Sequence, residues 1–135
     1  MGIFSMTIVV AIVLIVVAVI AYFMTNQGSR AGAPASRRIT PQEYQANYAT
    51  RDHLLLDVRT AKEFGTGHID GAANIAIQDL PKEMATLPKE KPIVLYCRSG
   101  ARSHAAAQML VNAGFQDVYD LGGITQWRAQ GLPVS

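Results

Sequence analysis

The segment from Pro92 to His104 constrains the fold most, because it predicts a strand, a tight loop and a helix in immediate succession. It opens with a short apolar run rich in branched residues, which is typical of a buried strand. It then reaches Ser103, a residue type favoured as a helix cap, so we expect a helix over 103–113 that stops at Gly114. The only cysteine of the chain, Cys97, therefore lies between a strand end and a helix N-terminus.

This position favours an ionised thiol at Cys97. Unpaired backbone N–H groups and the positive end of a helix dipole both stabilise a thiolate, and Arg98 and Arg102 add positive charge nearby. A lone cysteine after an apolar strand can also be a small buried hydrophobic residue. Two arginines around a Ser-Gly pair are costly there, however, unless they hold an anion or pair with carboxylates. The loop therefore favours a reactive thiol in an anion-binding cradle.

The loop Cys97-Arg98-Ser99-Gly100-Ala101-Arg102 resembles the active loop of the rhodanese family of sulfurtransferases. Three further segments match the same family in the same order. They are Leu55-Leu56-Asp57-Val58-Arg59, then Glu63-Phe64 with Gly67-His68-Ile69-Asp70-Gly71-Ala72-Ala73-Asn74-Ile75, and Leu121-Gly122-Gly123 with Trp127. The resemblance covers nearly all of residues 39–133 and implies a rhodanese-like domain over 39–135.

The resemblance also implies a reaction in two steps. The Cys97 thiolate takes the outer sulfur of a donor such as thiosulfate, and the resulting persulfide passes its sulfur to cyanide or a thiol. Backbone N–H groups of residues 98–103 would hold the anionic sulfur. Arg98 and Arg102 would attract the donor, brace the loop against Asp57 or Glu63, or do both. The expected substrate-binding residues are Arg98, Ser99, Gly100, Ala101, Arg102 and Ser103.

Three supporting residues, Asp57, Arg59 and Glu63, lie at or just after the end of the strand predicted over 53–58. Because the carboxyl ends of strands form the functional edge of an α/β sheet, Asp57 and Arg59 are expected near the loop. We predict that Asp57 bonds loop N–H groups and that Arg59 pairs with Glu63. The sequence shows no set of ligands at metal-binding spacing, and we expect neither a metal nor a cofactor.

Two other function classes compete with this interpretation. Cysteine-dependent phosphatases and arsenate reductases also use a cysteine, a backbone cradle and an arginine, but five residues separate their cysteine and arginine. Only four separate Cys97 from Arg102, which suits a single sulfur atom better. The second alternative is a membrane-tethered persulfide carrier or a binding module without turnover.

Alternating strands and helices predict an α/β domain of three layers, with a central parallel sheet flanked by helices. Strands are expected over 53–58, 73–75, 92–97 and 117–121. Helices are expected over 41–49, after the Thr60-Ala61-Lys62-Glu63 capping box, over 78–87, over 103–113 and around Trp127.

An apolar run over residues 6–24 precedes this domain. Its length of about 19 residues at about 1.5 Å each is close to the roughly 30 Å of a bilayer core, so we predict a transmembrane helix. A cleaved signal peptide is the alternative, although no basic residue precedes the run. A buried core helix would need a polar stripe to face water. Residues 25–38, rich in Gly, Ser and Ala, are expected to form a flexible linker.

Charge placement predicts the orientation of the domain and argues against one class of partner. Arg30, Arg37 and Arg38 follow the run, so the positive-inside rule places the domain in the cytoplasm, on a single-pass anchor in a bacterial-type inner membrane. The net charge of +2 does not favour nucleic acid as a partner. The resemblance implies a small anionic sulfur donor and a thiol or protein acceptor as partners, and the apolar run predicts the membrane as a third. The sequence does not predict an oligomeric state.

Overall fold

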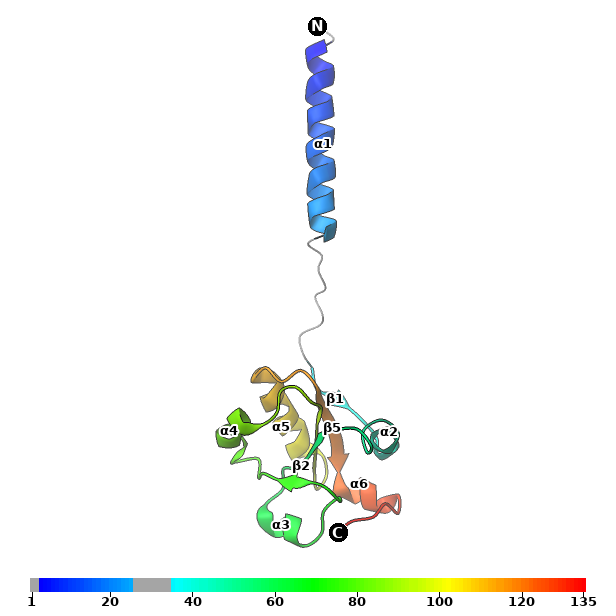
Figure 1. The fold of residues 1–135 in the computed structure, drawn as a ribbon, viewed down its shortest axis with the longest axis vertical. Coiled ribbons are helices and arrows are strands. Elements are labelled where there is room, and N and C mark those ends of the chain that lie inside the picture. The colour runs from blue at the N-terminus through cyan, green and yellow to red at the C-terminus, as the bar shows by residue number, and fades with distance from the viewer. Residues whose placement is uncertain (1–2, 26–34) are drawn as a thin grey trace. The chain divides into compact units, whose positions relative to one another are not determined.

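The computed structural model describes residues 3–25 and 35–135 and divides the chain into two compact units, Met1–Ala33 and Pro34–Ser135. Figure 1 shows the N-terminal helix and the α/β domain that make up these units. Residues 26–34, which include most of the predicted linker and Arg30, lie outside the described residues.

The N-terminal unit contains helix α1 (Ile3–Thr25). Its segment Met6–Met24 has 19 residues and a mean hydropathy of 3.1, and none of it is buried. A helix of this length and composition can cross a bilayer. A signal sequence can have the same length and composition.

The domain is built on a parallel sheet whose strands lie in the order β1-β5-β4-β2-β3. The strands are β1 (Arg37–Arg38), β2 (Leu54–Asp57), β3 (Ala73–Asn74), β4 (Ile93–Cys97) and β5 (Val118–Gly123). The parallel sheet and strands β2 to β5 confirm the prediction. Strand β1 was not predicted, because its two arginines were assigned to the linker; they pair with Tyr119 and Asp120 of β5.

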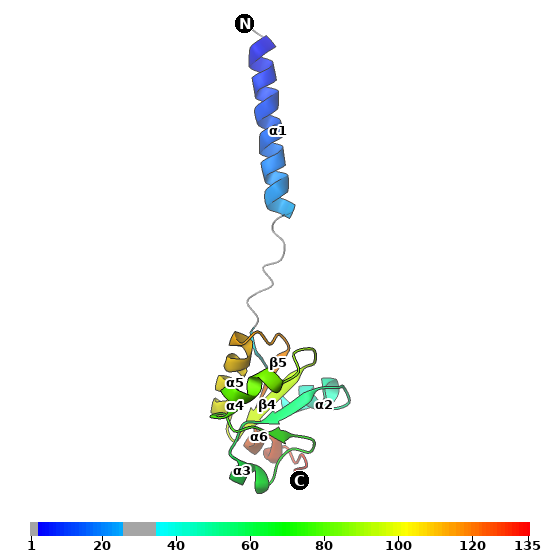
Figure 2. The same cartoon turned by 60° about the vertical axis from the view of Figure 1, so that its left-hand side comes forward.

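The helices form layers on both faces of this sheet. They are α2 (Pro41–Asn47), α3 (Ala61–Gly65), α4 (Leu80–Glu83) with the 3-10 turn η1 (Met84–Thr86), α5 (Ala101–Asn112) and α6 (Ile124–Ala129). Helices α4 and α5 lie on one side of the sheet, and α2 and α6 lie on the other (Figures 1 and 2). The three-layer prediction is therefore confirmed. The predicted helix over 78–87 is shorter than expected, since it gives way to η1 after Glu83.

Strand β4 divides its side chains between two apolar cores. Because successive side chains of a strand point to opposite faces, Ile93, Leu95 and Cys97 enter the core that includes α5. Val94 and Tyr96 enter the other core, which includes α2 and α6. The alternation therefore aims the cysteine side chain at helix α5.

The order of the strands brings the predicted site together. The chain runs from β2 to β3 in one direction and then returns past β2 to β4, so β2 and β4 are neighbours on either side of the reversal. Ligands of open α/β sheets bind outside the carboxyl ends of strands at such a reversal. Asp57 ends β2 and Cys97 ends β4, so both lie at this edge.

Candidate active site

The loop after β4 enters helix α5 earlier than predicted. The helix begins at Ala101, with Gly100 as the N-cap residue at φ 110°. A positive φ is accessible to glycine without steric cost, so the chain can turn into the helix directly after the Ser-Gly pair. The prediction of Ser103 as the cap is therefore wrong. Ser103 lies within the first turn, and its buried hydroxyl donates to Asp120 Oδ1 at 2.6 Å.

Cys97 is enclosed, with 1% of its surface exposed, but its sulfur has polar neighbours. The backbone N–H of Gly100 donates to Cys97 Sγ over 3.0 Å. Ser103 Oγ lies 3.6 Å from the same sulfur. An N–H group directed at a sulfur stabilises negative charge on it. The loop thus gives the thiol an anion-stabilising contact inside an otherwise apolar core.

The exposed part of the loop is held by the start of α6. The carbonyl oxygen of Arg98 accepts hydrogen bonds from the Thr125 N–H at 3.3 Å and the Thr125 hydroxyl at 3.0 Å. Gly123 packs closely against this part of the loop, because a Cβ added to it would come within 2.8 Å of the Ser99 Cα. The Arg98 and Ser99 side chains, and Ala101, are exposed.

Arg102 reaches across to helix α3 and binds Glu63. Its Nη1 and Nη2 donate to the two carboxylate oxygens of Glu63, each over 2.8 Å. These bonds, together with one from the Thr60 N–H, hold the pKa of the Glu63 carboxyl well below its usual value. The same contact raises the pKa of Arg102. The predicted pairing of Glu63 with Arg59 is therefore wrong, since the partner comes from the active loop's own helix.

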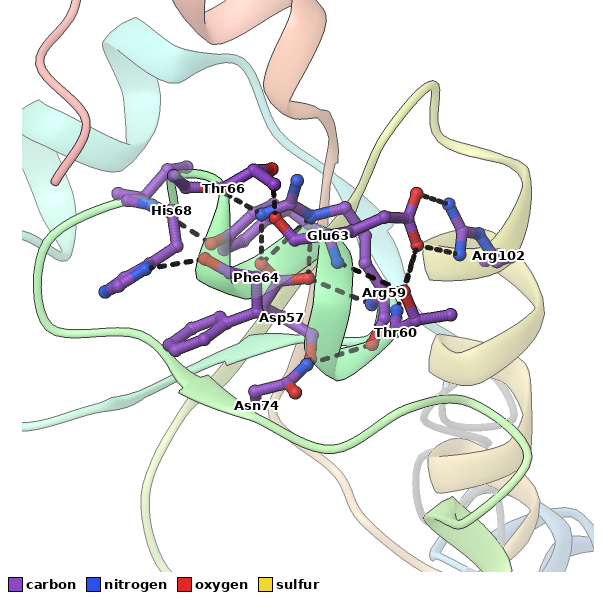
Figure 3. A network of polar contacts seen from close by, with 12 residues as sticks. Asp57, Arg59, Thr60, Glu63, Phe64, Thr66, His68, Asn74 and Arg102 are labelled. Carbon is purple, nitrogen blue, oxygen red and sulfur yellow. Dashed lines mark hydrogen bonds and ion pairs between the residues drawn. The ribbon is translucent and has the colours of Figure 1, made fainter.

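Arg59 instead pairs with Asp57 in a buried network at the end of β2 (Figure 3). The guanidinium donates from Nη2 to Asp57 Oδ2 at 2.6 Å, and the Arg59 backbone N–H donates to Asp57 Oδ1 at 2.9 Å. Burial on its own would lower the pKa of Arg59. The hydrogen bond to Asp57 and the charge of that carboxylate outweigh the effect of burial, so the pKa of Arg59 is raised. Arg59 also donates to the Gly67 carbonyl oxygen at 2.8 Å. The prediction that Asp57 bonds loop N–H groups is wrong, because the Arg59 side chain and backbone occupy its oxygens.

A pocket of about 240 Å³ opens beside the loop. Its lining residues are Arg59, Glu63, Thr66, Arg98, Ile124, Thr125 and Arg128. Arg98 and Arg128 are exposed, and neither forms an ion pair with another described residue. The pocket therefore carries two positive charges that remain available to an anion. Sequence reasoning missed Arg128, because nothing in its local pattern indicates that α6 borders the loop.

Asp120 is a second residue that sequence reasoning missed. It lies in β5 with 1% of its surface exposed, and it is bonded to Ser103 and to Arg38. The available signal was a carboxylate inside an apolar strand, which is costly unless it is paired. Among the described residues, no group of three or more His, Cys, Asp or Glu side chains could hold a metal ion.

Comparison with known proteins agrees with this geometry. The model of the rhodanese-like domain matches residues 40–130. A sulfurtransferase of Allochromatium vinosum is 42% identical over 86 residues, which are 63% of this chain and 80% of that protein. A thiosulfate sulfurtransferase GlpE of Stutzerimonas stutzeri is 34% identical over 93 residues, which are 68% of this chain and 84% of that protein.

Solved structures give the same result. The crystal structure of a rhodanese-related protein from Thermoplasma volcanium superposes with a TM-score of 0.67 at 32% identity, covering 73% of this chain and 97% of that one. Family model, relatives and structure agree over the domain that carries the Cys97 loop. The chain belongs to the rhodanese-like family and is homologous to its sulfurtransferases.

Proposed function

We propose that this protein is a sulfurtransferase that carries sulfane sulfur as a persulfide on Cys97. The donor is a small anion such as thiosulfate, and the acceptor is cyanide or a thiol. The thiolate attacks the outer sulfur of the donor, sulfite leaves with the electron pair of the broken S–S bond, and the persulfide waits for the acceptor.

The observation that carries this proposal is the Gly100 N–H group, which donates to Cys97 Sγ over 3.0 Å. A backbone donor aimed at the sulfur stabilises its charge without any reorganisation during the reaction. The sulfur also lies at the N-terminal end of α5, a helix of 12 residues whose dipole favours an anion there. The names of the relatives from Allochromatium vinosum and Stutzerimonas stutzeri support the same chemistry.

We propose that the donor approaches through the pocket beside the loop. Arg98 and Arg128 line this pocket and have no ion-pair partner among the described residues, so they are available to attract an anion. Arg102 has a different role in this proposal, because both of its terminal nitrogens are bonded to Glu63. It braces the loop and adds positive charge near the sulfur without binding the donor directly.

Cyanolysis by the full chain in detergent tests the proposal. We expect thiocyanate formation from thiosulfate and cyanide by the wild-type protein and none by Cys97→Ala. Cys97→Ser is the matched control, because it keeps a polar side chain of similar size but lacks a comparable nucleophile. Equal thiocyanate formation by all three proteins would contradict the proposal.

The enclosure of Cys97 favours a second candidate, a persulfide carrier for one protein acceptor. A sulfur with 1% of its residue surface exposed is shielded from small acceptors and requires loop movement or a docked partner to react. Mass spectrometry after incubation with thiosulfate separates the two candidates. An added sulfur on Cys97 that persists in cyanide supports the carrier, whereas its rapid loss as thiocyanate supports the enzyme.

We further propose that residues 6–24 anchor the domain to a bacterial-type inner membrane through one transmembrane helix, with the residues between this helix and strand β1 as the linker. The apolar length of Met6–Met24 supports this. Retention of the intact chain in the membrane after an alkaline carbonate wash is the expected result. A chain shortened at its N-terminus and released by the wash would instead indicate a cleaved signal peptide.

The domain faces the cytoplasm in this proposal. The three arginines after the helix support that orientation, although Arg38 also has a partner inside the domain, Asp120. Protease added to intact spheroplasts should leave the domain uncut, whereas protease added to inverted membrane vesicles should digest it. The opposite pattern would reverse the orientation.

A further inference from the structure

Asp120 is a buried carboxylate directly behind the Cys97 loop, and it joins three elements. Its Oδ1 accepts hydrogen bonds from the Ser103 hydroxyl at 2.6 Å and from the Gly122 N–H at 2.9 Å. Its Oδ2 accepts one from Arg38 Nη1 at 3.1 Å. These bonds connect β5 to the first turn of α5 and to the edge strand β1. A buried carboxylate with this many partners is held in a fixed position.

The Ser103 hydroxyl contacts both this carboxylate and Cys97 Sγ, so Asp120 acts on the sulfur through it. Ser103 Oγ lies near three acceptors, Asp120 Oδ1 at 2.6 Å and the carbonyl oxygens of Gly100 and Gly122 at 3.1 and 3.2 Å. A hydroxyl has one hydrogen, and a distance of 2.6 Å to a carboxylate is typical of a charge-assisted bond. The hydrogen therefore points to Asp120, and the oxygen turns a lone pair toward Cys97 Sγ at 3.6 Å.

This lone pair has a different effect on the Cys97 thiolate, the empty state, and on the Cys97 persulfide, the loaded state. It attracts a thiol hydrogen but repels negative charge on Sγ, and so opposes the Gly100 N–H and the Arg102 charge. In a persulfide the negative charge lies on the outer sulfur, one bond farther away, while Sγ itself is neutral. The contact therefore destabilises the bare thiolate more than the persulfide anion.

We propose that Asp120 is a positioning residue that acts through Ser103 to bias Cys97 toward the persulfide-loaded state. The inference rests on the proposed sulfurtransferase function. In the loading step an S–S bond forms between Cys97 Sγ and the outer sulfur of thiosulfate. The bond from that sulfur to the sulfonate sulfur breaks, and its electron pair leaves with sulfite. No proton and no further oxidant or reductant takes part.

Several charged groups surround the two residues and enter the design of the test. On α5, the positive charge of Arg102 interacts electrostatically with Cys97. His104, on the same helix, has its Nδ1 3.9 Å from Asp120 Oδ2. On β1, Arg38 pairs with Asp120, while 57% of its own side chain stays exposed. On α3, Glu63 forms an ion pair with Arg102. At the end of β2, Asp57 forms an ion pair with Arg59.

The test measures the alkylation rate of Cys97 in the full chain against pH. Asp120→Asn keeps the shape but removes the charge, so the midpoint of the profile should fall by about one pH unit. Arg38→Gln leaves the carboxylate without its cationic partner, so the midpoint should rise. Asp117→Asn removes an exposed carboxylate just before the same strand and should leave the midpoint unchanged. Repeating each profile with His104→Gln removes the imidazole beside Asp120 as a source of the shift.

The second readout is the fraction of protein that carries a persulfide, measured by mass spectrometry at a fixed ratio of thiosulfate to sulfite. We expect the equilibrium between loaded and empty protein to fall several-fold in Asp120→Asn and to be unchanged in Asp117→Asn. Arg38→Gln changes an exposed side chain, so it keeps the test valid if Asp120→Asn fails to fold, as judged by circular dichroism.

The two proposals fail in different ways. A wild-type protein that forms no persulfide contradicts the sulfurtransferase function, and the inference falls with it. A wild-type protein that forms persulfide, with variants that share its midpoint and its loaded fraction, overturns the role of Asp120 alone. Shifts of the same sign in Asp120→Asn and Arg38→Gln would also overturn it, because an electrostatic effect requires opposite signs.

Discussion

Arg102 and Glu63 join the helix of the active loop to helix α3 through two parallel hydrogen bonds of 2.8 Å each. The carboxylate also accepts the Thr60 N–H at 2.9 Å, so one side chain caps α3 and fixes α5. Loop position and the short helix after β2 are therefore coupled. A change at Glu63 should be detected both in stability and in the geometry around Cys97.

Glu63→Gln should destabilise the domain at neutral pH by about 1 kcal/mol, the scale of a partly exposed charged pair. Because folding lowers the pKa of Glu63, its contribution is present above the unfolded value of about 4.3 and is lost as pH falls below it. Urea unfolding at pH 7 and pH 3 should thus show a smaller difference between wild type and variant at the lower pH.

Glu43→Gln is the matched control for that series. Glu43 occupies the same capping-box position before α2, but its pairing with Arg37 is an exposed contact of 3.5 Å. We expect a loss that depends less on pH. Equal pH dependence in the two variants would show that the bonds from Arg102 do not stabilise the fold.

Asp57→Asn should be far more damaging, at about 3–5 kcal/mol, because it leaves the buried Arg59 guanidinium without its counter-charge. Asn74 bonds the carbonyl oxygens of Asp57 and Arg59, so the end of β2 should loosen with it. The measurement is the urea midpoint beside Asp52→Asn, whose carboxylate is 86% exposed and pairs with Lys91. A loss below about 1 kcal/mol, the scale of an exposed pair, would contradict the assigned role.

Gly123→Ala should impair catalysis more than stability. An added Cβ would stand 2.8 Å from Ser99 Cα and closer still to the Arg98 carbonyl oxygen, so the active loop has to move. We expect thiocyanate formation to fall at least tenfold. Gly65→Ala is the control, since nothing lies within 4 Å of a Cβ at that position. Comparable activity in both variants would mean that the loop tolerates the displacement.

Local patterns could be predicted from the sequence, and distant partners could not. Both capping boxes form as expected, because Thr60 and Glu63 are close in the chain and their bonds depend only on helix geometry. The alternation along β4 likewise follows from an apolar run with a fixed period. The Arg102 partner was ambiguous, because several carboxylates end strands or begin helices near the loop. Only the strand order decides which one Arg102 reaches.

Two features had no reliable local signal. Strand β1 consists of Arg37 and Arg38, whose residue types are typical of a linker. They form a strand because they pair in parallel with β5 at the edge of the sheet. The start of α5 depends on the positive φ of Gly100, and a glycine is compatible with a helix cap or with an extended loop. Ser103 was predicted to cap the helix because its true partner, Asp120 of β5, is 17 residues away in the chain and gives no local signal.

The anion pocket gives the last prediction. Arg128→Glu places a negative charge beside Arg98 in the pocket of about 240 Å³, so thiosulfate should be repelled where it was attracted. We expect KM for thiosulfate to rise about tenfold, the effect of roughly 1.4 kcal/mol, while kcat changes little because Arg128 does not contact the sulfur. Lys82→Glu makes the same charge change at a separate pocket that Arg98 does not line. If both variants raise KM equally, only net charge matters and the pocket beside the loop is not the donor's route.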